Sequence, residues 1–188
     1  MKPRLPPGQK LMKKMAIFSI ESTPYFDGEH WDLTLSGAIN NPKSLSWYEF
    51  NSIPQTSLNV DFHCVTTWSL FDTLWEGVLF KDLYELVDPE PEVNHVLIKA
   101  RSNYSTNLLL KDAIASNVIL ATKYNNQPIE AKHGAPLRLV VPDKYAYKAC
   151  KWVSEIIFLK DEQLGYWEQR GYSNFADPWR EQRYSSDD

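Results

Sequence analysis

Short segments in which apolar and polar residues alternate, or apolar residues follow one another, constrain the fold of this chain more than any other feature. Strict alternation places successive side chains on opposite faces of an extended backbone, as in a half-buried β-strand. Segments of this character lie at residues 31–37, 58–62, 95–101, 118–124, 137–141 and 152–159. We therefore expect a fold that is largely β.

Helical periodicity is confined to short stretches between these strands. Apolar residues at positions 80, 83, 84, 86 and 87 form one face of an amphipathic helix, which Asp88 and Pro89 end. Residues 44–50 and 108–115 also have helical spacing. The 188 residues are enough to bury a substantial core, and they contain neither an internal repeat nor a linker. A single domain of the α+β class is the expected architecture.

The two ends of the chain differ from this pattern. The first residues are rich in proline and lysine, so we expect residues 1–15 to form an extended arm and residues 16–188 to form the folded domain. The tail at residues 165–184 is aromatic and has no clear period. Both ends are candidate docking surfaces for a partner, and simple packing is the alternative for each.

Composition excludes several classes of function. A net charge of −4 and a pI near 5.6 argue against a general nucleic-acid binder. No apolar run reaches the roughly 18 residues of a membrane-spanning helix. The basic residues at the start precede an apolar run of residues 15–20 only, too short for a secretion signal, and no arginine pair precedes it. We therefore expect a cytoplasmic protein whose Cys64 and Cys150 are reduced.

Cys64 is the first residue that suggests chemistry, because it comes just after the strand at 58–62. A lone cysteine in apolar surroundings is most often a small buried hydrophobic residue. The functional alternatives are a nucleophile and a metal ligand. A zinc site would need closely spaced ligands, which His63, Cys64, His133 and Cys150 are not. A metal that brings most of its own ligands, such as molybdenum chelated by a pterin dithiolene, needs only one protein sulfur.

A basic stretch between residues 131 and 151 is the second such feature. Lys132, Arg138, Lys144, Lys148 and Lys151 face a single acid, Asp143. A run of charge is usually a solvated surface. Here, however, Tyr145, Tyr147 and a Val-Val-Pro turn interrupt it, so several cations should point the same way. Arginine and lysine together suit the phosphate and the polar ring edges of a pterin cofactor.

Six blocks of sequence, in this order, resemble those of the sulfite oxidase-like molybdopterin oxidoreductases. They are His63-Cys64-Val-Thr-Thr-Trp-Ser, Trp75-Glu-Gly-Val, Tyr104-Ser-Thr-Asn-Leu, His133-Gly-Ala-Pro-Leu-Arg-Leu-Val-Val-Pro, Lys148-Ala-Cys-Lys-Trp and Gly165-Tyr-Trp-Glu-Gln-Arg-Gly-Tyr. The resemblance covers roughly residues 16–184, and Arg4-Leu-Pro-Pro-Gly-Gln resembles the small soluble bacterial and archaeal members. It implies the sulfite oxidase-type fold, a molybdenum–molybdopterin cofactor and oxygen-atom transfer to or from a small sulfur or nitrogen oxo compound.

Carried over by position, the resemblance implies roles for individual residues. Cys64 would be the protein thiolate on molybdenum, with His63 beside it and Tyr104 near the reacting oxygen. The cofactor itself would be held by residues of the basic stretch, namely His133, Arg138, Ala149, Cys150 and Lys151. The segment Phe18-Ser-Ile-Glu would add further pterin contacts. For Tyr104 an ordinary core aromatic is the alternative, and for His63 a structural histidine.

Departures from the family pattern bear on the substrate. Sulfite oxidases carry arginine just before the cysteine and soon after it, whereas here His63 precedes it and Val65 to Trp68 contain no cation. The Cys-Val-x-x-Trp-Ser pattern is closer to the periplasmic reductases of protein methionine sulfoxide. A dianion such as sulfite would therefore gain less charge-assisted binding here.

No haem-binding block is visible, so electrons would pass to or from a separate partner protein. Two other classes of function compete with this reading. A non-catalytic binding module could have kept the cofactor fold without turnover, and a thiol enzyme could use Cys64 with His133. The second would carry no metal and would be inactivated by thiol reagents.

Overall fold

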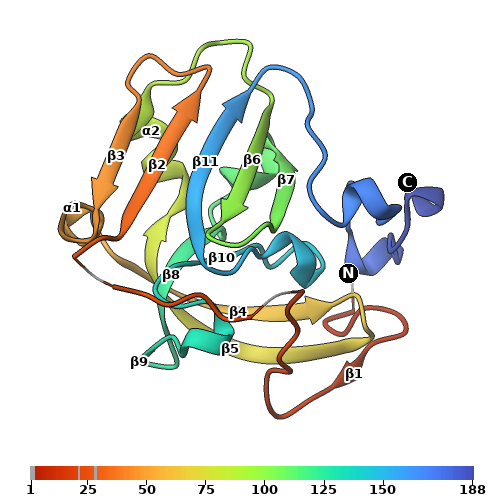
Figure 1. The fold of residues 1–188 in the computed structure, drawn as a ribbon. Helices are drawn as coiled ribbons and strands as arrows, with labels where there is room; N and C mark the ends of the chain where they lie inside the picture. Colours follow the sequence, from red (N-terminus) through yellow and green to blue (C-terminus); the bar gives the residue numbers. More distant parts are fainter. Residues whose placement is uncertain (1–2, 21, 28) are drawn as a thin grey trace.

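A computed structural model describes residues 3–20, 22–27 and 29–188 and contains two β-sheets connected by short helices (Figure 1). One sheet contains β1 (Lys10–Leu11), β4 (Thr56–Cys64), β5 (Trp68–Leu79), β8 (Ile119–Tyr124), β9 (Gln127–Pro128) and β10 (Arg138–Val140). The other has the order β3 (Lys43–Ser46), β2 (Asp32–Gly37), β11 (Val153–Leu159), β6 (His95–Ala100) and β7 (Ser105–Leu109). The chain thus folds mainly into β-strands, as the sequence predicted.

The second sheet is organised around β11. This strand pairs in parallel with β2 and antiparallel with β6, with Ile156 opposite both Leu35 and Ile98. Each of these three side chains is fully buried, as the alternation in the sequence requires. A cluster of buried side chains joins the sheets, since it includes Leu120 and Leu139 from the first and Leu33 and Phe158 from the second. The core therefore lies between the sheets.

A long antiparallel pair, β4 and β5, dominates the first sheet and ends at Cys64, which pairs with Trp68. The intervening turn contains Thr67 with φ of 73°. The sequence was compatible with a turn or a short helix after Cys64, and the twelve-residue strand β5 that follows the turn was not predicted. Trp75, at the middle of β5, is fully buried, and pairing with β4 and β8 specifies this strand more than its own sequence does.

Helix α2 (Phe80–Val87) has the predicted limits, with Asp88 in the left-handed conformation at its C-cap. The other two helical predictions were half right. Residues 44–50 divide into β3 and helix α1 (Trp47–Ser52), which Ser46 caps together with Glu49. Residues 108–115 contain the end of β7 and a single turn, α3 (Leu110–Ala113), because pairing with β6 keeps Leu108 and Leu109 extended.

The remaining helical turns are 3₁₀ segments, and three of them make up the C-terminal tail. The five segments are η1 (Ala131–His133), η2 (Ala146–Lys148), η3 (Glu168–Arg170), η4 (Pro178–Arg180) and η5 (Ser185–Asp187). Such short turns explain why the tail has no sequence period. The tail packs beside the N-terminal arm, where Trp179 Nε1 donates a hydrogen bond to Pro3 O at 2.8 Å (Figure 1). In the described ranges, no helix is long and apolar enough to cross a membrane.

Candidate active site

A cavity of about 230 Å³ opens beside Cys64. Five parts of the chain form its walls: the segment after β1, the end of the β4–β5 pair, Tyr104 between β6 and β7, the stretch from η1 to Trp152, and the tail. The lining residues used below are Met15, Phe18, Ser19, Ile20, Phe62, Cys64, Val65, Thr66, Trp68, Tyr104, His133, Arg138, Tyr147, Ala149, Lys151, Trp167 and Tyr172. Residues distant in sequence thus meet at one site.

Cys64 occupies the last position of β4, so its thiol is held by sheet backbone. Its side chain is 7% exposed, and its Sγ lies 3.1 Å from Thr66 Oγ1 in the turn. A hydroxyl at this distance can donate a hydrogen bond to a thiolate or accept one from a thiol. The arrangement provides one rigidly placed sulfur ligand at the cavity wall.

Arg138 is the principal cation of the cavity. Its guanidinium is 5.1 Å from the ring of Phe62 and 5.6 Å from that of Trp75, and its Nη1 donates to His133 O at 2.8 Å. Burial lowers the pKa of Arg138 to about 10, so the group is charged at neutral pH. Its Nε is buried and has no partner. A buried N–H group without a partner destabilises the folded protein unless a ligand accepts a hydrogen bond from it.

Lys151 and His133 extend this positive region. Lys151 Nζ donates to Phe18 O at 2.6 Å, which ties the cation to the segment after β1. Burial and, next, the charge of Arg138 lower the pKa of Lys151 to about 8. The same two effects, in the same order, lower the pKa of His133. Burial and the neighbouring charge of Arg138 thus act in the same direction on both groups, and an anionic ligand would oppose them.

Tyr104 also lines the cavity, but its hydroxyl is engaged by the protein. The hydroxyl donates to the main-chain oxygen of Tyr147, and burial raises the pKa of Tyr104 well above its usual value. The side chain therefore serves as a neutral hydrogen-bonding group. Its contact ties the end of β6 and β7 to η2, whose Tyr147 is another wall of the cavity.

Two of the residues suggested by sequence lie behind the wall. His63 is 1% exposed, its Nδ1 is 2.8 Å from Ser69 Oγ, and its ring meets that of Trp179 edge-on at 5.0 Å. Burial lowers its pKa. Cys150 is also 1% exposed, and burial raises the pKa of its thiol, so it stays protonated. Ala149, the neighbour of Cys150 in the sequence, does line the cavity.

Several lining residues were not singled out as site residues. Met15 lay in no motif. Thr66 lay in the block that begins at His63, and Trp167 and Tyr172 lay in the block that begins at Gly165, but none of the three was given a role in the site. Of the segment Phe18-Ser-Ile-Glu, the first three residues line the cavity, whereas Glu21 lies outside the described residues. The turn that follows Cys64 and the aromatic tail were the sequence features from which these residues could have been assigned to the site.

The lining suits a ligand that combines a planar ring system, a phosphate and a metal. Aromatic side chains supply apolar surface, Arg138 and Lys151 supply charge, and the unpartnered Arg138 Nε supplies a free donor. Across the described ranges, no group of three or more His, Cys, Asp or Glu side chains could hold a metal ion alone. A metal at Cys64 would therefore need ligands from a cofactor. Fold and site together define a domain that binds an anionic cofactor.

A comparison with known protein families also indicates a cofactor-binding domain. Residues 20–167 match the oxidoreductase molybdopterin binding domain. The chain is 35% identical to an uncharacterised oxidoreductase, YuiH, of Bacillus subtilis, over 98% of this chain and 93% of that protein. The chain belongs to the molybdopterin-binding oxidoreductase family, and it is an oxidoreductase whose cofactor is molybdopterin. The expected family, class of enzyme and cofactor are confirmed.

More distant relatives have named activities. The chain is 27% identical to the catalytic subunit MsrP of a protein-methionine-sulfoxide reductase from Campylobacter jejuni, over 80% of this chain and 56% of that one. It is 23% identical to sulfite oxidase of Arabidopsis thaliana, over 78% of this chain and 46% of that one. The chain thus spans about half the length of these two relatives.

A solved structure confirms the fold class. The sulfane dehydrogenase SoxCD of Paracoccus pantotrophus superposes with a TM-score of 0.70 at 16% identity, over 81% of this chain and 44% of that one. The largely β, α+β fold of the sulfite oxidase type, predicted from sequence, is therefore the one observed.

Proposed function

We propose that this protein binds molybdenum–molybdopterin with Cys64 as the protein ligand of the metal, and that it catalyses oxygen-atom transfer. The observation that carries the proposal is a single cavity lined by one thiol and by two cations, the buried Arg138 and the half-buried Lys151. A thiolate is a soft ligand that suits a metal–sulfur centre, and coordination removes its proton.

Each part of the cavity has a distinct task in this proposal. When bound, the cofactor supplies two-electron redox chemistry that moves an oxygen atom to or from a substrate. Arg138 and Lys151 hold the cofactor's phosphate and polar ring edges, and His133 and the main chain around Ala149 complete that wall. Thr66 donates to the Cys64 sulfur. Tyr104 remains protonated and braces the wall through Tyr147.

A neutral sulfur or nitrogen oxide is the substrate class that we favour over sulfite. Val65 packs in a cluster that includes Tyr147, Trp167 and Tyr172, so the wall beside the cysteine turn is aromatic. In this proposal Arg138 and Lys151 bind the cofactor, and His63 is buried and does not line the cavity. A dianion would lose its hydration there without a cation to replace it. We propose that a separate protein supplies or accepts the two electrons.

Metal content and pterin fluorescence test the proposal directly. The protein is expressed in a host that makes molybdopterin, and molybdenum is measured by plasma mass spectrometry. Near-stoichiometric metal in the parent and a much lower content or altered metal absorption in Cys64→Ser would support the ligand assignment. A screen of sulfite, sulfoxides and N-oxides would then identify the substrate.

Two other results would favour the competing functions. Bound molybdopterin with no turnover of any such compound would indicate a binding module. A folded protein without molybdenum that thiol reagents inactivate as a hydrolase would indicate catalysis by Cys64 with His133.

A further inference from the structure

The turn that carries Cys64 is held from two sides by the opposite ends of the chain. On one side lies the N-terminal arm: Gln9 Nε2 donates to Cys64 O at 3.2 Å, and Lys10 N donates to Thr67 O at 2.9 Å. On the other side lies the tail, where Arg183 Nη1 donates to Val65 O. The carbonyls of Cys64 and Thr67 thus accept from the N-terminal arm, and the carbonyl of Val65 between them accepts from the tail.

The donors are themselves fixed. Gln9 is 7% exposed, and its Oε1 accepts from Ser69 Oγ at 3.2 Å, while Ser69 is also 2.8 Å from His63 Nδ1. The amide therefore cannot turn away without breaking a buried network. Arg183 packs with its guanidinium 4.9 Å from the ring of Tyr145. Both donors are held in place by groups outside the cavity.

The arm and tail also meet each other. Gly8 has φ of 68°, and a Cβ there would lie 3.0 Å from Glu181 Oε1 and 3.4 Å from Arg183 Nη2. The positive φ favours glycine at this position, and the absence of a side chain lets the arm lie close to the ends of the Glu181 and Arg183 side chains. Trp179 Nε1 completes the contact by donating to Pro3 O. The two ends thus form one support beneath the cysteine turn.

We infer that Gln9 and Arg183 are positioning residues for the Cys64 thiol. Neither side chain lines the cavity, so each acts on the sulfur through the main chain of the turn. A metal ligand that must sit at one point on a cavity wall gains from a turn that cannot open. This inference rests on the proposed role of Cys64, but the mobility of the turn can be measured in the protein without cofactor.

The test is the rate at which a disulfide reagent labels Cys64 in full-length, cofactor-free protein. A Cys150→Ala background makes the signal specific. We expect Gln9→Met to raise the rate about fivefold and Arg183→Met about tenfold or more, because a neutral and a charge-assisted hydrogen bond are lost. Arg183→Lys, which keeps a donor, should restore most of the protection.

Matched controls separate positioning from general loosening. Gln169 Nε2 donates to Leu164 O, and Arg170 Nη1 donates to Tyr166 O while its guanidinium packs on the Tyr166 ring. Gln169→Met and Arg170→Met therefore remove the same chemistry elsewhere in the tail and should leave the labelling rate within twofold of the parent. The inference is overturned if Gln9→Met and Arg183→Met label no faster than these controls at equal urea stability.

The same variants loaded with cofactor provide a second, separate readout. Gln9→Met should shift or broaden the sulfur-to-metal absorption while the molybdenum content stays near that of the parent. If labelling responds as expected but no variant binds molybdenum, the support is real and the proposed metal site is wrong. If metal is bound and neither readout moves, the positioning role is wrong and the site remains.

Discussion

At the scale of single residues, Cys64 and Cys150 offer a comparison within one molecule. Both are buried, yet only Cys64 lines the cavity. We expect Cys64→Ser to lower turnover by at least about 100-fold, more than the loss of an outer-shell partner, because the soft ligand is gone. Pterin content should fall much less. Cys150→Ala should retain activity, and wild-type turnover in Cys64→Ser would contradict the ligand assignment.

Lys151 gives the site a pH dependence with a definite sign. Its pKa is about 8, so the group is a cation below that pH and loses its charge as the pH rises through it. If Lys151 binds the cofactor's phosphate, retention of pterin should fall as the pH rises above about 8. Bound phosphate favours the charged form and moves this midpoint upward. Arg138, with a pKa of about 10, stays charged over most of the range.

Dialysis at a series of pH values, followed by pterin fluorescence, measures this dependence. Lys151→Met should bind about tenfold more weakly at neutral pH and should lose the step near pH 8. Lys132, which pairs with Glu130 at 2.7 Å, provides the control, and Lys132→Met should keep the step. An unchanged step in Lys151→Met would mean that another group causes it.

Sequence indicated most of the cavity's charged and reactive groups because their types are unusual. A lone cysteine after a strand and a cluster of cations around Arg138 are visible without coordinates. The aromatic wall at Trp167 and Tyr172 was not assigned to the site, because 3₁₀ turns give no period from which to infer a face. The hydrogen bond from Gln9 to Cys64 O could not be predicted from sequence either. A side chain that donates to a main-chain oxygen 55 residues away leaves no local sequence pattern.

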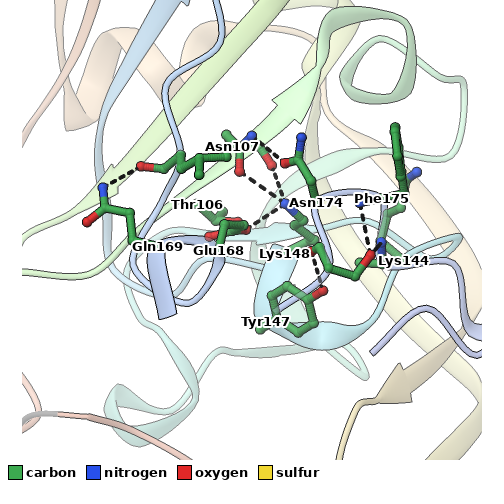
Figure 2. Close-up of polar contacts among 12 residues, drawn as sticks. Thr106, Asn107, Lys144, Tyr147, Lys148, Glu168, Gln169, Asn174 and Phe175 are labelled. Atoms are coloured by element: carbon green, nitrogen blue, oxygen red, sulfur yellow. Dashed lines mark hydrogen bonds and ion pairs between the residues drawn. The ribbon is translucent and has the colours of Figure 1, made fainter. Parts of the chain in front are cut away.

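At the scale of elements, a buried ion pair joins β7, η2 and the tail behind the cavity (Figure 2). Lys148 Nζ contacts Glu168 Oε1 at 2.5 Å and donates to Asn107 O at 2.9 Å, and both charged side chains are at most 1% exposed. Thr106 Oγ1 donates to the same carboxylate oxygen at 2.8 Å. The neighbours Tyr147 and Trp167 line the cavity, so this pair holds two of its walls together.

Removal of one member of this ion pair should strongly destabilise the folded protein. Lys148→Met leaves the Glu168 carboxylate buried without a cation, and we expect the free energy of unfolding to fall by about 3–5 kcal/mol. Lys148→Met combined with Glu168→Gln should recover much of the loss. Urea denaturation measures both. Lys160→Met, which breaks the half-exposed contacts to Glu90 and Glu92, should leave the midpoint nearly unchanged. Equal effects of Lys148→Met and Lys160→Met would contradict this account.

The elements that sequence predicted well are those whose local pattern agrees with their pairing. Helix α2 has an apolar face and a left-handed stop, and β2, β6 and β11 alternate. Residues 108–115 were misread because Leu108 and Leu109 fit a helix locally but are extended by pairing with β6. Strand β5 was missed because Asp72, Glu76 and Gly77 interrupt its apolar residues, so that only its long-range partners define the strand.

At the scale of the whole molecule, both sheets have their cores within residues 31–159, whereas the two ends meet over the cysteine turn. The expected boundary between an arm of residues 1–15 and a domain of residues 16–188 stays a prediction, and it places the tail in the domain. The arm contributes a two-residue strand, β1, in parallel with β5, and the pairs of Arg4 with Asp61 and Asp72. It should therefore support the site more than it supports the fold.

A chain that begins at Met12 tests this division, because it lacks Arg4, Gln9 and β1. We expect it to fold with an unchanged near-ultraviolet circular dichroism spectrum and to lose about 1–3 kcal/mol of stability, since only a few hydrogen bonds are removed. Labelling of Cys64 should nevertheless rise at least as much as in Gln9→Met. A truncated chain that fails to fold would make the arm part of the domain. A truncated chain that folds and labels at the parental rate would show that the tail alone holds the turn.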